Sequence, residues 1–139
     1  MKFPTSYKEL NKIFLNASDP VIAELNGEYI VDILSFLPSF KRLSHRKIMY
    51  TRAKTQLGHN VLSGRTWGRF SVSEGTFKES DFLKAVRLNY DREKNFFIIK
   101  NIRDYIRCIE DNTLYIGKFY YRIFERSIFI GYFSLEKIQ

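Results

Sequence analysis

The stretch from Ile102 to Glu136 reads IRDYIRCIEDNTLYIGKFYYRIFERSIFIGYFSLE and predicts three antiparallel strands joined by two tight turns. Asp111 and Asn112 mark the first turn, because both residues tolerate the positive φ that a hairpin turn requires. The second turn is placed at 125–126, where the alternation of apolar residues begins again. We expect the rest of the chain to complete this sheet.

Two-residue turns would fix the pairing between these strands. In the first hairpin the expected pairs are Ile109–Leu114, Arg107–Ile116, Tyr105–Lys118 and Arg103–Tyr120; in the second they are Ile123–Ile128, Tyr121–Ile130 and Phe119–Tyr132. Because side chains alternate between the faces of a strand, one face is mainly apolar, with Asp104 as its only charge away from the strand ends. The other face mixes cations with rings: Arg103, Tyr105, Arg107, Lys118, Tyr120, Arg122, Phe129 and Phe133. Neither face is cleanly polar, so both are expected to contact something.

Length and composition predict one folded domain spanning residues 1–139, with a helix and lead-in over 1–20 and a barrel over 21–139. The chain has 139 residues, of which 45% are hydrophobic and 17% aromatic, and this content excludes a disordered protein. The net charge of +8 permits binding to nucleic acid, an anionic membrane or an acidic ligand. The single cysteine, Cys108, excludes an intrachain disulfide and suits a reducing compartment. No signal peptide or membrane-spanning run is apparent, so we expect a cytoplasmic protein.

The chain in order supports a mainly β fold. Ser6 and Glu9 form a capping box for a short helix, whose apolar stripe we expect to close one end of the sheet. Alternating segments predict strands up to Leu34, within 41–54, around Trp67 and over 82–90, and residues 96–100 predict a short apolar strand. Turns recur about every ten residues, which is typical of an antiparallel meander closed into a barrel of about eight strands.

Three segments resemble lipocalin-like (calycin) barrels, and in particular small bacterial GXWXG proteins of unknown function. They are the pair Gly27 and Tyr29, the GRTWG of residues 64–68, and the closing stretch from Arg103. Tyr29 stands where those proteins usually have Trp, and the Trp67 motif falls in mid-chain. The resemblance implies a cup that holds a small hydrophobic ligand, and it carries no catalytic residues over.

The first functional hypothesis is a non-catalytic binding protein for a hydrophobic ligand with an acidic head group. Guanidinium forks and phenols bind carboxylates strongly, so the head would be held by Arg103, Tyr105, Arg107, Tyr120 and Arg122. The apolar part of the ligand would contact Trp67, Phe129 and Phe133. The alternative is that this face of the sheet lies outside, with the cations in solvent and their stems covering the rings.

A different class of function is a basic interaction module. The segment 41–54 carries the densest run of positive charge and could bind nucleic acid or an acidic protein. Trp67 between Arg65 and Arg69 could stack on a base, although a single strand tryptophan is more often part of the core. His45 and His59 have no recognisable partners for a metal, no catalytic set is apparent, and no cofactor is predicted. A third hypothesis is an isomerase or cyclase that uses the barrel cavity, but no residue pair argues for it.

Overall fold

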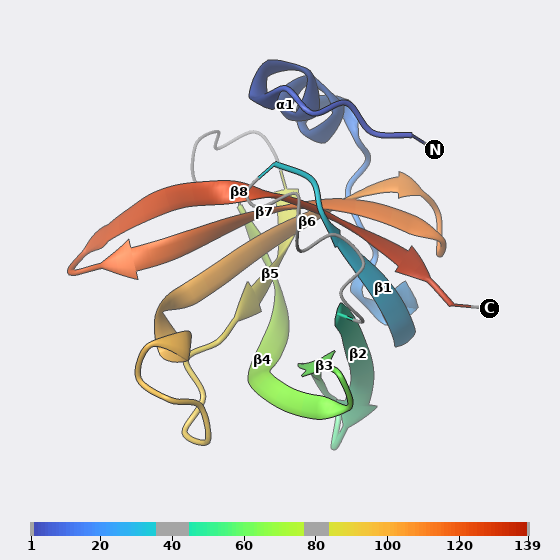
Figure 1. The fold of residues 1–139 in the computed structure, drawn as a ribbon. Helices are drawn as coiled ribbons and strands as arrows, with labels where there is room; N and C mark the ends of the chain where they lie inside the picture. Colours follow the sequence, from blue (N-terminus) through green and yellow to red (C-terminus); the bar gives the residue numbers. More distant parts are fainter. Residues whose placement is uncertain (1, 36–44, 77–83, 139) are drawn as a thin grey trace.

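The structure is a computed structural model that describes residues 2–35, 45–76 and 84–138. Its eight strands close into an antiparallel barrel in which each strand pairs with the next and β8 pairs with β1 (Figure 1). The strands are β1 (Gly27–Ile33), β2 (His45–Arg52), β3 (Thr55–Leu62), β4 (Arg65–Thr76), β5 (Lys84–Asn89), β6 (Ile102–Glu110), β7 (Leu114–Ile123) and β8 (Arg126–Lys137). The predicted meander barrel of about eight strands with one short N-terminal helix is confirmed.

Alternate residues of the strands form two separate apolar clusters. The cluster inside the barrel includes Tyr29, Met49, Phe70, Leu88, Ile106 and Phe133. Two glycines make room for its rings: a Cβ on Gly117 would lie 2.2 Å from Phe133, and one on Gly58 would lie 2.4 Å from Phe70. These glycines are therefore required by close packing across the barrel interior.

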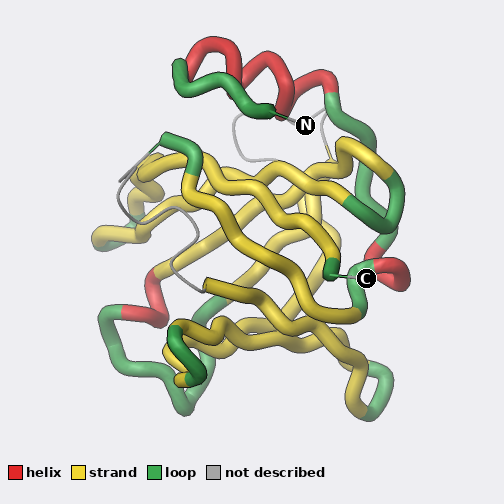
Figure 2. Tube along the Cα trace, turned by 45° about the vertical axis from the view of Figure 1, so that its right-hand side comes forward, coloured by secondary structure: helices red, strands yellow, loops and turns green. Residues whose placement is uncertain are grey.

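The helix α1 (Tyr7–Asn16) begins as predicted, with the Ser6 side chain accepting a hydrogen bond of 3.2 Å from the Glu9 amide. Its buried residues Leu10 and Phe14 pack against outward-facing residues of the barrel wall, including Tyr105 and Ile116. Figure 2 shows the helix lying outside the strands. The expectation that it closes an end of the sheet is thus wrong, because its apolar stripe covers the outer face of the wall.

The register of the first predicted hairpin is largely confirmed. Arg107 pairs with Ile116, Tyr105 with Lys118 and Arg103 with Tyr120, but a bulge near the turn replaces the Ile109–Leu114 pair by Glu110–Leu114. The bulge arises because the turn uses three residues, with the Thr113 amide bonded to the Glu110 carbonyl at 3.0 Å.

The predicted register of the second hairpin is wrong. Its turn residues are 124–125, so Ile123 pairs with Arg126 and Tyr120 with Phe129, and a bulge beyond Tyr120 then pairs Phe119 with Gly131. These changes place Phe133 opposite Gly117 and inside the barrel, where it joins the interior cluster. A shift of one residue reverses the face of every side chain beyond it.

Two short predicted strand segments differ in the structure. Residues 96–98 form no strand: they lie in a turn with all three side chains exposed, followed by the 3-10 helix η3 (Ile99–Asn101). The first strand starts at Gly27 rather than at 21 or 24, because Ile22–Glu24 forms the 3-10 helix η1. Ile22 packs against the interior cluster, and its carbonyl accepts a hydrogen bond of 3.3 Å from Gln56. The helix η1 therefore covers the end of the barrel opposite to η3.

Candidate functional site

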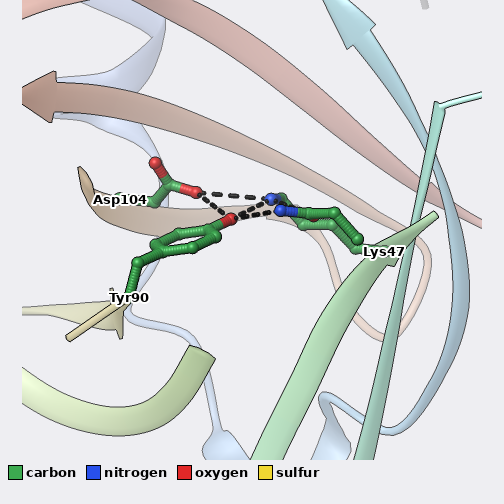
Figure 3. A network of polar contacts seen from close by, with 4 residues as sticks. Lys47, Tyr90 and Asp104 are labelled. Carbon is green, nitrogen blue, oxygen red and sulfur yellow. Dashed lines mark hydrogen bonds and ion pairs between the residues drawn. The ribbon is translucent and has the colours of Figure 1, made fainter. Parts of the chain in front are cut away.

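A buried polar network lies inside the barrel and joins strands that are far apart in sequence. The Lys47 ammonium donates to Asn60 Oδ1 at 2.7 Å and to the Tyr90 hydroxyl at 2.6 Å, and lies 3.3 Å from Asp104 Oδ2. Asn60 donates to the Tyr90 hydroxyl at 2.8 Å, and that hydroxyl donates to Asp104 at 3.1 Å. Figure 3 shows the ammonium facing both the hydroxyl and the carboxylate. The three hydrogens of Lys47 thus have three acceptors.

The network is a neutral unit rather than a free charge. Burial lowers the pKa of Lys47 and raises the pKa of Asp104, while the attraction between the two groups opposes both shifts. Burial also raises the pKa of Tyr90, which therefore stays a phenol. The rings of Phe70, Tyr90 and Phe133 surround the ammonium, with centroids 5.2, 5.4 and 5.5 Å from Nζ. The hydrogen bonds and the surrounding rings therefore hold the Lys47 amino group in one position inside the barrel.

A pocket of about 130 Å³ lies beside this network. Its apolar wall consists of Val31, Ile33, Trp67, Ile102, Phe119 and Phe133, and its polar groups are His45, Lys47, Tyr90 and Asp104. Ile33, Trp67, Ile102 and Phe119 are only half-buried, so the pocket reaches solvent at the end of the barrel where η3 lies. The pocket is therefore a small, mostly apolar recess with its polar groups gathered in one part.

His45 is the unusual group in the pocket. Its Nε2 is buried without a hydrogen-bond partner among the described residues, and its ring lies 5.4 Å from Trp67. Burial, reinforced by the charge of Lys47, lowers the pKa of His45 to about 3. The imidazole is consequently neutral at physiological pH, and one of its nitrogens is unpartnered in a residue that lines the pocket.

The eight residues that the sequence predicted for ligand binding lie in two different parts of the structure. Trp67 and Phe133 line the pocket. The remaining six lie on the outer surface of the barrel wall and do not reach the pocket: Arg103, Tyr105, Arg107, Tyr120, Arg122 and Phe129. This face lies outside the barrel, as in the alternative, but Arg103 and Arg107 are buried there, at 7% and 3% exposure, rather than in solvent.

The outer residues have structural partners of their own. Arg107 donates to the Phe14 carbonyl at 2.9 Å, to the Ala17 and Lys84 carbonyls, and to Asp19 at 3.0 Å. It therefore ties the end of α1 to the barrel. Tyr120 packs edge-to-face on Tyr105 and on Phe129, with centroid distances of 5.5 and 5.6 Å.

Arg103 and Arg122 differ in their burial. The Arg103 guanidinium donates to the carbonyls of Lys100 and Ile102 at 2.6 and 2.8 Å, so it supports the turn that precedes β6. Arg122 is exposed near the tip of the β7–β8 hairpin. Neither guanidinium points into the pocket.

Sequence reasoning missed His45, Lys47, Tyr90 and Asp104 as one site. A signal existed, because Asp104 was the only charge on an otherwise apolar strand face, and a buried carboxylate needs a buried partner. The partner could not be identified, because Lys47 stands in a run of cations that reads as a solvated strand.

The basic segment 41–54 is not a uniform charged surface. Lys47 points into the barrel, Arg46 forms an exposed ion pair of 2.9 Å with Glu28, and residues 41–44 lie outside the described residues. Trp67 stacks nearly parallel to Tyr90 at 6.4 Å, in the pocket wall. Within the described ranges, no group of three His, Cys, Asp or Glu side chains could hold a metal ion, and no helix could span a membrane.

Comparison with known protein families, curated proteins and solved structures finds no match for this chain. Fold and site therefore define the class of this protein: an eight-stranded antiparallel meander barrel with a small interior pocket. Its relation to lipocalin-like proteins stays a prediction.

Proposed function

We propose that this protein is a non-catalytic binding protein for a small, largely apolar molecule carrying one polar group. The observation that carries the proposal is the Nε2 of His45, which has no partner among the described residues and belongs to a mostly apolar recess. A buried polar atom without a partner costs about 1–3 kcal/mol, and a ligand that bonds to it would remove that cost. The volume of about 130 Å³ fits a molecule of six-membered-ring size.

The pocket favours an uncharged polar group over the acidic head group expected from the sequence. Its one cation, Lys47, is already neutralised by Asp104, and His45 is neutral. A hydroxyl or carbonyl can bond to neutral imidazole as it stands, because each nitrogen either donates or accepts. An acid would have to protonate His45 or displace Asp104 from Lys47. The cytoplasmic location expected from the sequence is retained in the proposal.

The test uses Trp67, the only tryptophan of the chain and part of the pocket wall. Its fluorescence is titrated with four probes of one size: cyclohexanol, cyclohexanone, cyclohexanecarboxylate and methylcyclohexane. We expect saturable changes with the alcohol or the ketone, and weaker binding of the hydrocarbon. Native mass spectrometry of the freshly purified protein, repeated after denaturing extraction, would identify a ligand retained from the cell.

Variants separate the pocket from the rest of the surface. Ile33→Phe should narrow the recess and abolish binding, whereas the same change at the exposed Ile128 should leave binding unaltered. His45→Phe should remove the preference for the alcohol over methylcyclohexane. If no probe binds, or if both phenylalanine variants bind as the wild type does, the pocket is not a ligand site. Preferential binding of cyclohexanecarboxylate would instead support the ligand with an acidic head group that the sequence predicted.

A further inference from the structure

The largest exposed apolar side chains are gathered on two segments at one end of the barrel. Phe124 is 95% exposed, Phe96 81% and Phe97 77%, and Ile98, Ile123 and Ile128 are also exposed. Together they make up six of the ten large hydrophobic residues exposed within the described ranges, so the grouping is local. We refer to residues 96–98, 123–124 and 128 as the apolar tips.

The two segments are neighbours in space. The 3-10 helix η3, which directly follows 96–98, packs against β7, whose last residue is Ile123. Tyr121 pairs with Ile102, only one residue beyond η3. In Figure 1 the β7–β8 hairpin and the loop before β6 project on the same side of the barrel. The apolar tips therefore protrude together, beside the end at which the pocket reaches solvent.

Folding alone does not account for Phe124. It occupies a turn with φ of 56°, a conformation suited to Asn or Gly and unfavourable for a bulky side chain. Its ring is almost fully exposed, so it gains no burial that would offset this cost. An unfavourable backbone conformation that brings no structural benefit is expected at a functional site.

The charges beside the apolar tips are predominantly positive. Segments 91–101 and 122–128 contain five basic residues (Arg92, Lys94, Lys100, Arg122 and Arg126) and three acidic ones, while the whole chain carries +8. Protruding rings flanked by Lys and Arg match an anionic bilayer, where apolar groups enter the acyl boundary and cations remain among the head groups.

We propose that the apolar tips dock this barrel on the surface of an anionic lipid bilayer, with Phe96, Phe97 and Phe124 inserted at the interface. We choose a bilayer over a folded partner because the exposed rings come from two separate turns, both flanked by Lys and Arg. Docking would bring the open end of the pocket to the membrane, but the proposal stands on the exposed rings and does not depend on a pocket ligand.

Co-sedimentation with large vesicles tests the proposal. The full chain is mixed with phosphatidylcholine vesicles, or with vesicles that also contain phosphatidylglycerol, at low and at high salt. We expect binding to the anionic vesicles, weakened but not abolished by salt. Each phenylalanine removed should weaken partitioning about tenfold, as expected for losing one buried ring. The variants are Phe124→Ser and the pair Phe96→Ser with Phe97→Ser.

Val21→Ser is the matched control, since Val21 is 54% exposed beside η1 at the opposite end of the barrel. Insertion is measured directly with Phe124→Trp in a Trp67→Phe background, where anionic vesicles should shift the emission to the blue and brominated lipid should quench it. Absence of vesicle binding, or binding that salt abolishes and the serine variants leave unchanged, would overturn the proposal. A dimer that the same variants dissociate, without vesicle binding, would also overturn it and assign the tips to a second copy.

Discussion

A double-mutant cycle on Lys47 and Asp104 examines the polar network on which the site is built. Lys47→Met removes the ammonium but retains an apolar stem of similar length, and Asp104→Leu replaces the carboxylate by an apolar side chain. Both residues are almost completely buried, with side-chain exposures of 3% and 4%. Each single variant therefore leaves one uncompensated charge in the barrel interior, unless that group changes its protonation.

The expected magnitudes follow from this burial. Breaking a buried ion pair from one side costs about 3–5 kcal/mol of unfolding free energy. The double variant removes both charges and keeps the Asn60–Tyr90 hydrogen bond of 2.8 Å, but it leaves the Asn60 carbonyl without Lys47 and the Tyr90 hydroxyl without Asp104 as its acceptor. Each of these two defects costs about 1–3 kcal/mol. With values from the middle of both ranges, the coupling energy should be about 4 kcal/mol.

Urea unfolding followed by circular dichroism gives the four free energies of the cycle. A single variant that is unfolded without urea still agrees with the prediction, provided that the double variant folds. Single variants that each cost less than about 1 kcal/mol, with additive effects, would refute the reasoning. In that case Lys47 and Asp104 would not be a charged pair in the folded barrel.

Three further predictions concern packing, pH and the helix. Gly117→Ala should lower the unfolding free energy by about 1–3 kcal/mol, and combining it with Phe133→Leu should cost less than the sum of the two changes, because the added methyl group meets that ring. His45 has a pKa of about 3 in the folded protein and an ordinary value of 6.5. As the pH falls, its imidazole is therefore protonated in the unfolded chain before it is protonated in the folded protein. Stability should therefore fall as the pH drops from 6.5 towards 3, by up to about 1.4 kcal/mol per pH unit. His45→Gln should remove that part of the dependence, and a parallel pH profile in wild type and variant would contradict it. Arg107→Met should cost about 2–3 kcal/mol and accelerate hydrogen exchange in α1 more than in β2, since it removes the hydrogen bonds from the guanidinium to the Phe14 and Ala17 carbonyls. Equal acceleration in both elements would show that Arg107 does not act through the helix.

The sequence by itself determined the class of fold. Alternation with period two and turns about every ten residues specify antiparallel strands, because both are local properties of the chain. The cap at Ser6 and the pairing of Arg107 with Ile116 were predictable for the same reason. Asp104 also stood out locally, as a charge among apolar residues of one strand face.

Only the tertiary structure decided which face of each strand points inward and which residues meet there. A bulge between Phe119 and Tyr120 in the pairing of β7 with β8 moved Phe133 to the interior, and no local pattern marks that bulge. The site joins Lys47, Tyr90 and Asp104 across three strands, and this juxtaposition exists only after the barrel has closed. Charge type alone could not separate the buried Lys47 from the exposed Arg46 beside it, because burial is a property of the whole fold.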